Sequence, residues 1–318
     1  MKKVLSLLFV LVIIAGVFTG CADKSAAKAG FELSIVYDAH YSQVESGAID
    51  VYDQLCRAVI DGDTSVEVNN DLYDDASRLF YVSFPLSNLV KSMNLNSDGS
   101  IRITYTETVS QHKQLVSEFT DKVYSALSDC GYPDTQGNEL LLNIYSYVSE
   151  NIKQNLEYST TYDAFLLGEG SSSAYEAMFR YLVQQAGFSA SRVYGVAHDG
   201  THFMTEVELD GETYYFDPYS EYTFSQGKGL SYFGLGNIGL QKMGLGSEVS
   251  YSDDQPIDFG NDSGRFDDLY QTVSYKYEGG VITATKKRAQ LLKLHYKTEQ
   301  MGGVNFHSLL NVHKNKCK

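Results

Sequence analysis

The chain has 318 residues, enough for one large domain or two small ones, and its 40 acidic and 25 basic residues give a formal net charge of −15. This acidic balance argues against a nucleic-acid partner and favours a soluble, mutually repulsive surface. The 25 tyrosines suit an extracytoplasmic binding surface, although they suit half-buried strand positions equally well.

Residues 1–21 have the pattern of a targeting segment. Lys2 and Lys3 precede an apolar run over residues 4–17, and the sequence FTGC ends at Cys21. The segment resembles a bacterial lipoprotein signal, which implies that Cys21 receives lipid and anchors the protein to the cell membrane on its extracytoplasmic face. A single-pass helix is the alternative, but the apolar run is shorter than the roughly 20 residues that span a bilayer.

Residues 22–30 are expected to form a short tether, and residues 31–133 an N-terminal α+β subdomain. The expected elements are strands at 31–37, 77–84 and 100–107, a helix with the apolar stripe Ala48, Tyr52, Leu55 and Val59, and a long helix ending near Cys130. Asp98 and Gly99 predict a turn before the third strand. A calcium loop is the alternative there, but Tyr105 stands where that loop needs a glutamate.

Cys56 and Cys130 fall on the apolar stripes of the two expected helices. Both are interpreted as small buried hydrophobic residues, and a disulfide between them is not favoured. Neither cysteine is expected to act as a nucleophile.

Residues 134–283 predict a second domain, which opens with an amphipathic helix carrying Leu141, Ile144, Val148 and Ile152. Ser172 then begins another helix, against which the first is expected to pack. The apolar stripe of this second helix comprises Tyr175, Met178, Phe179, Leu182 and Ala186. Ser173 and Glu176 predict a capping box, and Gly187 is placed to end the helix.

A β-hairpin is expected around Asp210-Gly211, because this pair predicts a two-residue type I′ turn between strands at 202–209 and 212–219. The turn fixes a register that pairs Leu209 with Glu212, Val207 with Tyr214, Met204 with Asp217, and His202 with Tyr219. His202 and Asp217 are then diagonal neighbours on one face, about 7 to 8 Å apart at the backbone. An imidazole and a carboxylate so placed form a base with its orienting acid, and Ser172 is placed as the nucleophile.

These segments resemble the transglutaminase-like core, which has the papain-like cysteine peptidase fold. The family's pattern of two glycines before the nucleophile is matched by Gly168-Glu169-Gly170-Ser171-Ser172, its histidine motif by His202-Phe203-Met204, and its aspartate motif by Asp217-Pro218-Tyr219. Ser172 replaces the family's Cys, Met204 its Trp and Tyr219 its Thr. The resemblance implies an α+β fold with a transglutaminase-like core and gives Ser172, His202 and Asp217 the catalytic positions.

Serine changes the chemistry expected at the first of these positions. A helix N-terminus stabilises an anion by about 0.3 to 1 kcal/mol, and one pKa unit corresponds to about 1.4 kcal/mol. This field brings a thiol of pKa about 8.5 near neutrality but leaves a hydroxyl protonated. Ser172 can attack only if His202 removes its proton during the reaction and oxyanion donors are aligned.

Each of the three residues also has a purely structural interpretation. Ser172 lies among serines that can cap a helix, His202 can be an exposed strand residue, and Asp217 can begin a turn before Pro218. His198 and His202 have the spacing of a helical metal pair, but Gly200 and the surrounding strand pattern argue against a helix, so no metal and no cofactor is expected.

The composition changes near the C-terminus, where residues 284–318 hold eight Lys or Arg against the single Glu299. A disordered basic tail is the prediction, and binding to anionic lipid or to the acidic body is the alternative. For the whole protein we expect a membrane-anchored binding protein that takes a peptide, protein or cell-wall strand without turnover. An acyl-transfer enzyme or amide hydrolase using Ser172, and a surface scaffold, are the alternative functions.

Overall fold

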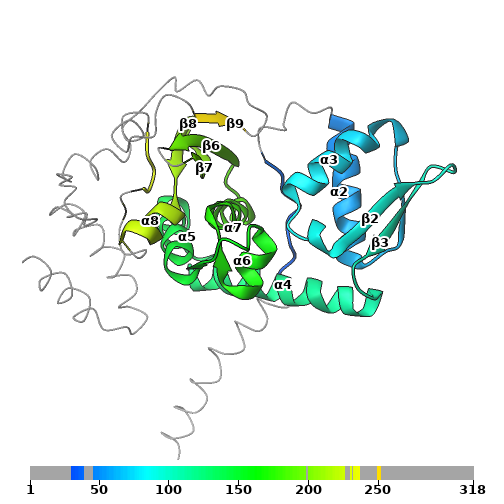
Figure 1. Cartoon of the computed structure of the whole chain (residues 1–318), viewed down its shortest axis with the longest axis horizontal. Coiled ribbons are helices and arrows are strands. Elements are labelled where there is room, and N and C mark those ends of the chain that lie inside the picture. The colour runs from blue at the N-terminus through cyan, green and yellow to red at the C-terminus, as the bar shows by residue number, and fades with distance from the viewer. Residues whose placement is uncertain are drawn as a thin grey trace, which may run out of the picture. The chain divides into compact units, whose positions relative to one another are not determined.

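The computed structural model describes residues 30–38, 46–197, 200–225, 230, 232–236 and 249–251. For residues 194–197, 200–202, 225 and 249–251 it describes the backbone alone. The predicted lipidation site Cys21 and the tail at 284–318 lie outside these ranges. Residues 1–34 and Ile35 onward form two units. Helices and strands both occur in the second unit, so the α+β class is confirmed (Figure 1).

Up to α8, the elements follow one another along the chain with short connections. Up to residue 133 they are α2 (Ser46–Asp61), β1 (Ser65–Glu67), η2 (Asn70–Leu72), α3 (Tyr73–Ser83), η3 (Ser87–Leu89), β2 (Val90–Leu95), β3 (Ser100–Tyr105) and α4 (Val109–Asp129). After it they are α5 (Gly137–Asn151), β4 (Lys153–Gln154), α6 (Thr161–Leu167), β5 (Glu169–Gly170), α7 (Ser172–Gln185), β6 (Ala190–Ala197), β7 (Gly200–Leu209), β8 (Glu212–Phe216), α8 (Pro218–Ser225) and β9 (Val249–Tyr251). Among the described helices, none combines the length and apolar character needed to cross a bilayer.

Two of the strands expected before residue 133 are wrong. Residues 77–83 belong to helix α3, with Phe84 as its C-cap residue, and the buried residues of the helix recur at helical spacing: Ala76, Leu79, Phe80 and Ser83. Residues 31–37 have no strand partner. The backbone there is satisfied differently, since the carbonyl of Val36 accepts from the Tyr52 hydroxyl and that of Tyr37 from the Gln184 amide.

The turn at Asp98-Gly99 is confirmed as a hairpin between β2 and β3. Gly99 has a φ of 92°, and the Asp98 carboxylate accepts the backbone N–H of Ser100, as turn aspartates commonly do. A three-stranded sheet results, in which β3 lies between β1 and β2. Strand β2 was not expected from the sequence.

The long helix α4 ends as predicted, with Cys130 as its C-cap residue. Cys130 and Cys56 are both buried and free, so the two cysteines are not joined. Burial raises the pKa of the Cys56 thiol well above its usual value and that of Cys130 to about 12. Helix α4 contacts α2 from the first half and α5, α6 and α7 from the second. The division predicted at residue 133 stays a prediction.

Helix α7 is the central element of the second half. Twelve of its 14 residues are buried, so it is covered on every side rather than along one stripe. It packs against α5, as expected, where the rings of Tyr145 and Phe179 meet edge to face at 5.8 Å. It also contacts β6 and β7 of a four-stranded sheet ordered β8-β7-β6-β9 (Figure 1).

The predicted hairpin between β7 and β8 is confirmed. Asp210 and Gly211 have φ angles of 56° and 82°, the left-handed pair of a type I′ turn. Leu209 pairs with Glu212 and Val207 with Tyr214, as predicted. The expected pairings of Met204 with Asp217 and of His202 with Tyr219 are wrong, because the ladder ends at the Thr205–Phe216 pair and Tyr219 lies in helix α8.

Candidate functional site

Ser172 is the first residue of α7, and the glycines before it explain how the chain reaches that position. Gly168 ends α6 in the left-handed conformation with a φ of 66°. A Cβ at Gly170 would lie 2.4 Å from the Cβ of Ala174, so only glycine lets the chain pass this close to α7. The N–H of Ser171 donates to the carbonyl of Tyr158 at 2.7 Å. Ser172 is thereby held, half-buried, at the start of a long helix.

The capping box predicted for Ser173 and Glu176 is wrong. Ser171 is the N-cap residue and makes no capping bond through its side chain. Glu176 is completely buried, and its carboxylate accepts hydrogen bonds from Arg180 at 2.7 Å and Arg192 at 2.6 Å. Two guanidinium groups therefore compete successfully with the helix N-terminus for this carboxylate.

Asp217 directly follows β8, and its side chain is fully buried. One carboxylate oxygen accepts the N–H of Ser220 at 2.9 Å, so Asp217 caps the start of α8, where Pro218 needs no hydrogen-bond acceptor. The Asp217 carbonyl accepts from the hydroxyl of Tyr145 at 3.2 Å. The residue thus has a structural role at the end of the sheet.

The structure brings the first turns of α7 and α8 together. The ring of Tyr175 meets that of Tyr219 at 5.4 Å and that of Tyr222 at 5.6 Å. Ser172 and Asp217 therefore lie at the ends of two helices that are in contact. His202 lies in β7, where its backbone pairs with Gly195 of β6. Its side chain is outside the described residues, so the assembly of all three groups stays a prediction.

The two other departures from the family motif occupy ordinary structural positions. Met204 is fully buried in β7. Tyr219 packs on Tyr175, and its hydroxyl accepts from the amide of Gln154 at 2.7 Å. Both side chains thus contribute to the packing of the fold.

Arg192, which sequence analysis did not single out, lies beside the start of α7. Its Nη2 donates to the hydroxyl of Ser173 at 3.1 Å, and its guanidinium carbon lies 5.0 Å from the centre of the Phe203 ring. The hydroxyl of Thr205 reaches the Glu176 carbonyl at 3.4 Å, so this stretch of β7 faces α7. The i, i+4 spacing of Glu176 and Arg180 was the sequence signal for a charge pair here.

The described part of the chain offers no replacement for the family's thiol. Cys56 and Cys130 are buried in other helices, and their raised pKa values keep them as thiols. Among the same residues, no three His, Cys, Asp or Glu side chains are grouped to hold a metal ion. His198, the partner in the metal pair considered from the sequence, lies outside the described residues.

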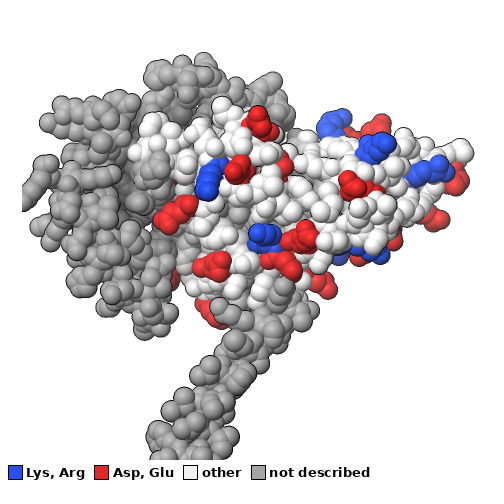
Figure 2. All heavy atoms as spheres, turned by 60° about the horizontal axis from the view of Figure 1, so that its bottom comes forward, with Lys and Arg blue, Asp and Glu red and all other residues white. Residues whose placement is uncertain are grey.

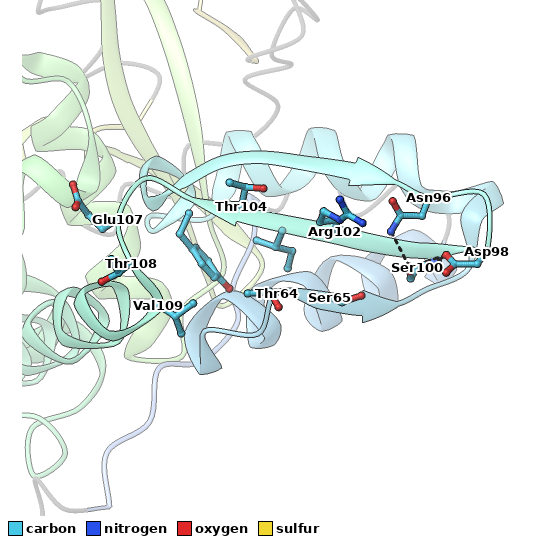
Figure 3. Close-up of a pocket in the computed structure, with 12 residues that line it drawn as sticks. Thr64, Ser65, Asn96, Asp98, Ser100, Arg102, Thr104, Glu107, Thr108 and Val109 are labelled. Atoms are coloured by element: carbon cyan, nitrogen blue, oxygen red, sulfur yellow. Dashed lines mark hydrogen bonds between the residues drawn. The ribbon is translucent and has the colours of Figure 1, made fainter.

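A groove of about 570 Å³ lies on the other sheet, away from Ser172. Figure 3 shows Arg102 and Thr104 on β3 pointing into it, with Asn96 and Asp98 at the hairpin end and Glu107 and Thr108 at the start of α4. The Asn96 amide donates to the Ser100 hydroxyl at 2.9 Å. The groove is open, has both polar and apolar lining, and includes none of the residues predicted for catalysis.

Comparisons with known proteins find likeness only among solved structures. No family model matches the sequence, and no curated protein matches it. A structure described as a TGase is 12% identical over 48% of this chain and 39% of that chain, with a TM-score of 0.31. A candidate cysteine protease from Cytophaga hutchinsonii is 11% identical over 40% of this chain and 60% of its own, with a TM-score of 0.27. This chain therefore spans less than two thirds of either protein.

Proposed function

We propose that this protein binds a peptide, protein or cell-wall strand at the surface around Ser172 without turning it over. The observation that carries the proposal is the serine at the first position of α7, where the transglutaminase-like motif has its nucleophilic cysteine. The sequence motif around Ser172, His202 and Asp217 supports a site at this position, and the serine argues against a reactive one.

The physical argument rests on the difference between a thiol and a hydroxyl. The field of a helix N-terminus shifts a pKa by about one unit, which activates a thiol but not an alcohol several units less acidic. A serine nucleophile needs an imidazole within hydrogen-bond distance and donors placed for the oxyanion, and misplacement by about 1 Å costs roughly 100-fold in rate. A site arranged for sulfur is not thereby aligned for the shorter oxygen.

We also propose that Cys21 is lipidated and anchors the protein at the extracytoplasmic face of the membrane. The basic start, the apolar run and the cysteine after residue 20 support this. Metabolic labelling with a fatty acid in a bacterial host should mark the full chain and fail in a Cys21→Ala variant. Equal labelling of the two would contradict lipidation at this residue.

One set of assays separates the binding protein from the enzyme. The full chain, purified in detergent, is compared with Ser172→Ala and Ser172→Cys for hydrolysis of peptide amides and for incorporation of an amine into glutamine. The proposal expects no turnover by the wild type above that of Ser172→Ala. Activity that appears only in Ser172→Cys would show that the surroundings are competent and that the hydroxyl is the missing element.

Turnover by the wild type that is lost in Ser172→Ala would overturn the proposal in favour of the enzyme. In that case His202→Ala and Asp217→Asn should reduce the rate strongly as well, because a serine depends on a base and its orienting acid.

A further inference from the structure

A buried carboxylate links two arginines next to Ser172. Glu176 is completely buried and accepts from the Nε of Arg180 and from the Nε of Arg192, whose side chains are 6% and 24% exposed. Arg180 is thus enclosed, whereas the Arg192 side chain is partly exposed. The Arg192 side chain is the exposed end of an otherwise buried charge network.

The guanidinium of Arg192 is fixed in place before any ligand binds. Its Nε donates to Glu176 at 2.6 Å, its Nη2 donates to the Ser173 hydroxyl at 3.1 Å, and its guanidinium carbon lies 5.0 Å from the centre of the Phe203 ring. Its own backbone N–H donates to the buried carboxylate of Asp38 at 2.7 Å. A side chain held from three directions loses little further freedom when it binds a partner.

Hydrogen-bond donors remain unused on this side chain. Within the described residues, Nη1 of Arg192 makes no hydrogen bond, and Nη2 makes one, to the oxygen of Ser173. Because the Ser173 hydroxyl accepts that bond, its own hydrogen is available to donate. The exposed edge of Arg192 and the Ser173 hydroxyl thus offer several donors side by side.

We propose that Arg192 and Ser173 bind a carboxylate of the ligand that the surface around Ser172 receives, an inference that rests on the binding function proposed above. The fork of Nη1 and Nη2 matches the two oxygens of a carboxylate. A doubly charged phosphate fits less well, because the carboxylates of Glu176 and Asp38 already balance the charges of Arg180 and Arg192. The ligand is a peptide that presents an acidic side chain or a free C-terminus.

The test follows the ¹⁵N–¹H resonances of arginine Nε groups in the full chain in detergent. The Arg192 signal is assigned by its loss in Arg192→Lys. N-acetylglutamate amide is titrated against N-acetylglutamine amide, and acetyl-trialanine acid against acetyl-trialanine amide. These two pairs distinguish an acidic side chain from a C-terminus as the source of the carboxylate.

We expect at least one acid to shift the Arg192 resonance saturably, with at least tenfold weaker binding of the matching amide. Ser173→Ala should weaken binding of that acid several-fold while leaving the Arg192 signal in place. The signal of Arg57, whose Nε and Nη2 already bond to Asp53, is the internal control and should not move.

Equal shifts by acids and amides, a matching shift of Arg57, or tighter binding of inorganic phosphate than of either acid would overturn the carboxylate site. These outcomes are distinct from failure of the proposed function. Turnover at Ser172 would end the non-catalytic proposal and leave carboxylate binding intact, whereas a silent Arg192 without turnover would end only this inference.

Discussion

At the scale of single residues, burial decides how much each charged group contributes to the stability of the fold. Arg180–Glu176 and Arg57–Asp53 are both i, i+4 pairs on helices, with distances of 2.7 and 2.6 Å. The first pair has exposures of 6% and 0%, the second of 62% and 38%. Equal geometry in such different surroundings makes the two pairs a direct comparison.

We predict that Glu176→Gln lowers the free energy of unfolding by about 3 kcal/mol, because removing one partner leaves buried charges uncompensated. Asp53→Asn, the control at the exposed pair, should cost less than about 0.5 kcal/mol. Urea unfolding of both variants measures the difference. Similar losses in the two would show that burial of this network does not matter.

His112 gives a pH-dependent prediction. It is 1% exposed, its Nε2 lies 2.6 Å from the carbonyl of Val59, and its buried Nδ1 has no hydrogen-bond partner. Burial lowers the pKa of His112 below its usual value, and nearby Lys113 lowers it further. Below about pH 6.5, His112 therefore binds a proton in the unfolded chain more readily than in the folded chain. The free energy of unfolding consequently falls as the pH falls.

His112→Gln keeps an amide donor for Val59 but cannot titrate. Its free energy of unfolding should fall less than that of the wild type between pH 7.5 and pH 5.5. Urea unfolding at the two pH values tests this, and identical losses in both proteins would rule out His112 as the source.

At the scale of elements, the hairpin that positions β7 depends on its turn. Gly211 has a φ of 82°, and nothing lies within 4 Å of the place where its Cβ would be. Gly211→Ala should therefore cost about 1 kcal/mol from backbone strain alone, without any clash. Gly30→Ala is the control, since Gly30 has equal space and no left-handed φ. Equal losses of thermal stability in the two variants would show that the left-handed φ of Gly211 is not the cause.

The elements that carried strong local signals could be predicted from the sequence. The β7–β8 register followed from Asp210-Gly211, because two left-handed residues leave one possible turn. The pattern of residues 77–84 also fitted a strand, but Ala76, Leu79, Phe80 and Ser83 recur at the i, i+3, i+4, i+7 spacing of a helix, so the local signal for α3 was present and was misinterpreted.

The candidate site could be predicted only in part from the sequence. Ser172 and Asp217 were found because helix starts and strand ends have local signatures. Arg192 was missed, because its importance comes from Glu176, which lies 16 residues away in another element. Contacts between elements of this kind need the fold before they can be recognised.

At the scale of the whole molecule, the chain combines an acidic body with a predicted membrane anchor. The part after Cys21 carries a net charge of −17. Figure 2 shows basic side chains dispersed among acidic ones on the face in view rather than gathered into a patch. A mixed, acidic surface keeps such a protein soluble and leaves recognition to particular groups, of which Arg192 is the one proposed here.

The central claim is that the Ser172 hydroxyl is not an activated nucleophile. A fluorophosphonate probe, which reacts with activated serines, tests this directly on the folded full chain, with site occupancy measured by mass spectrometry and trypsin as the positive control in a parallel tube. We predict that Ser172 stays unmodified while trypsin reacts completely. Stoichiometric labelling of Ser172 that disappears in His202→Ala would contradict the account.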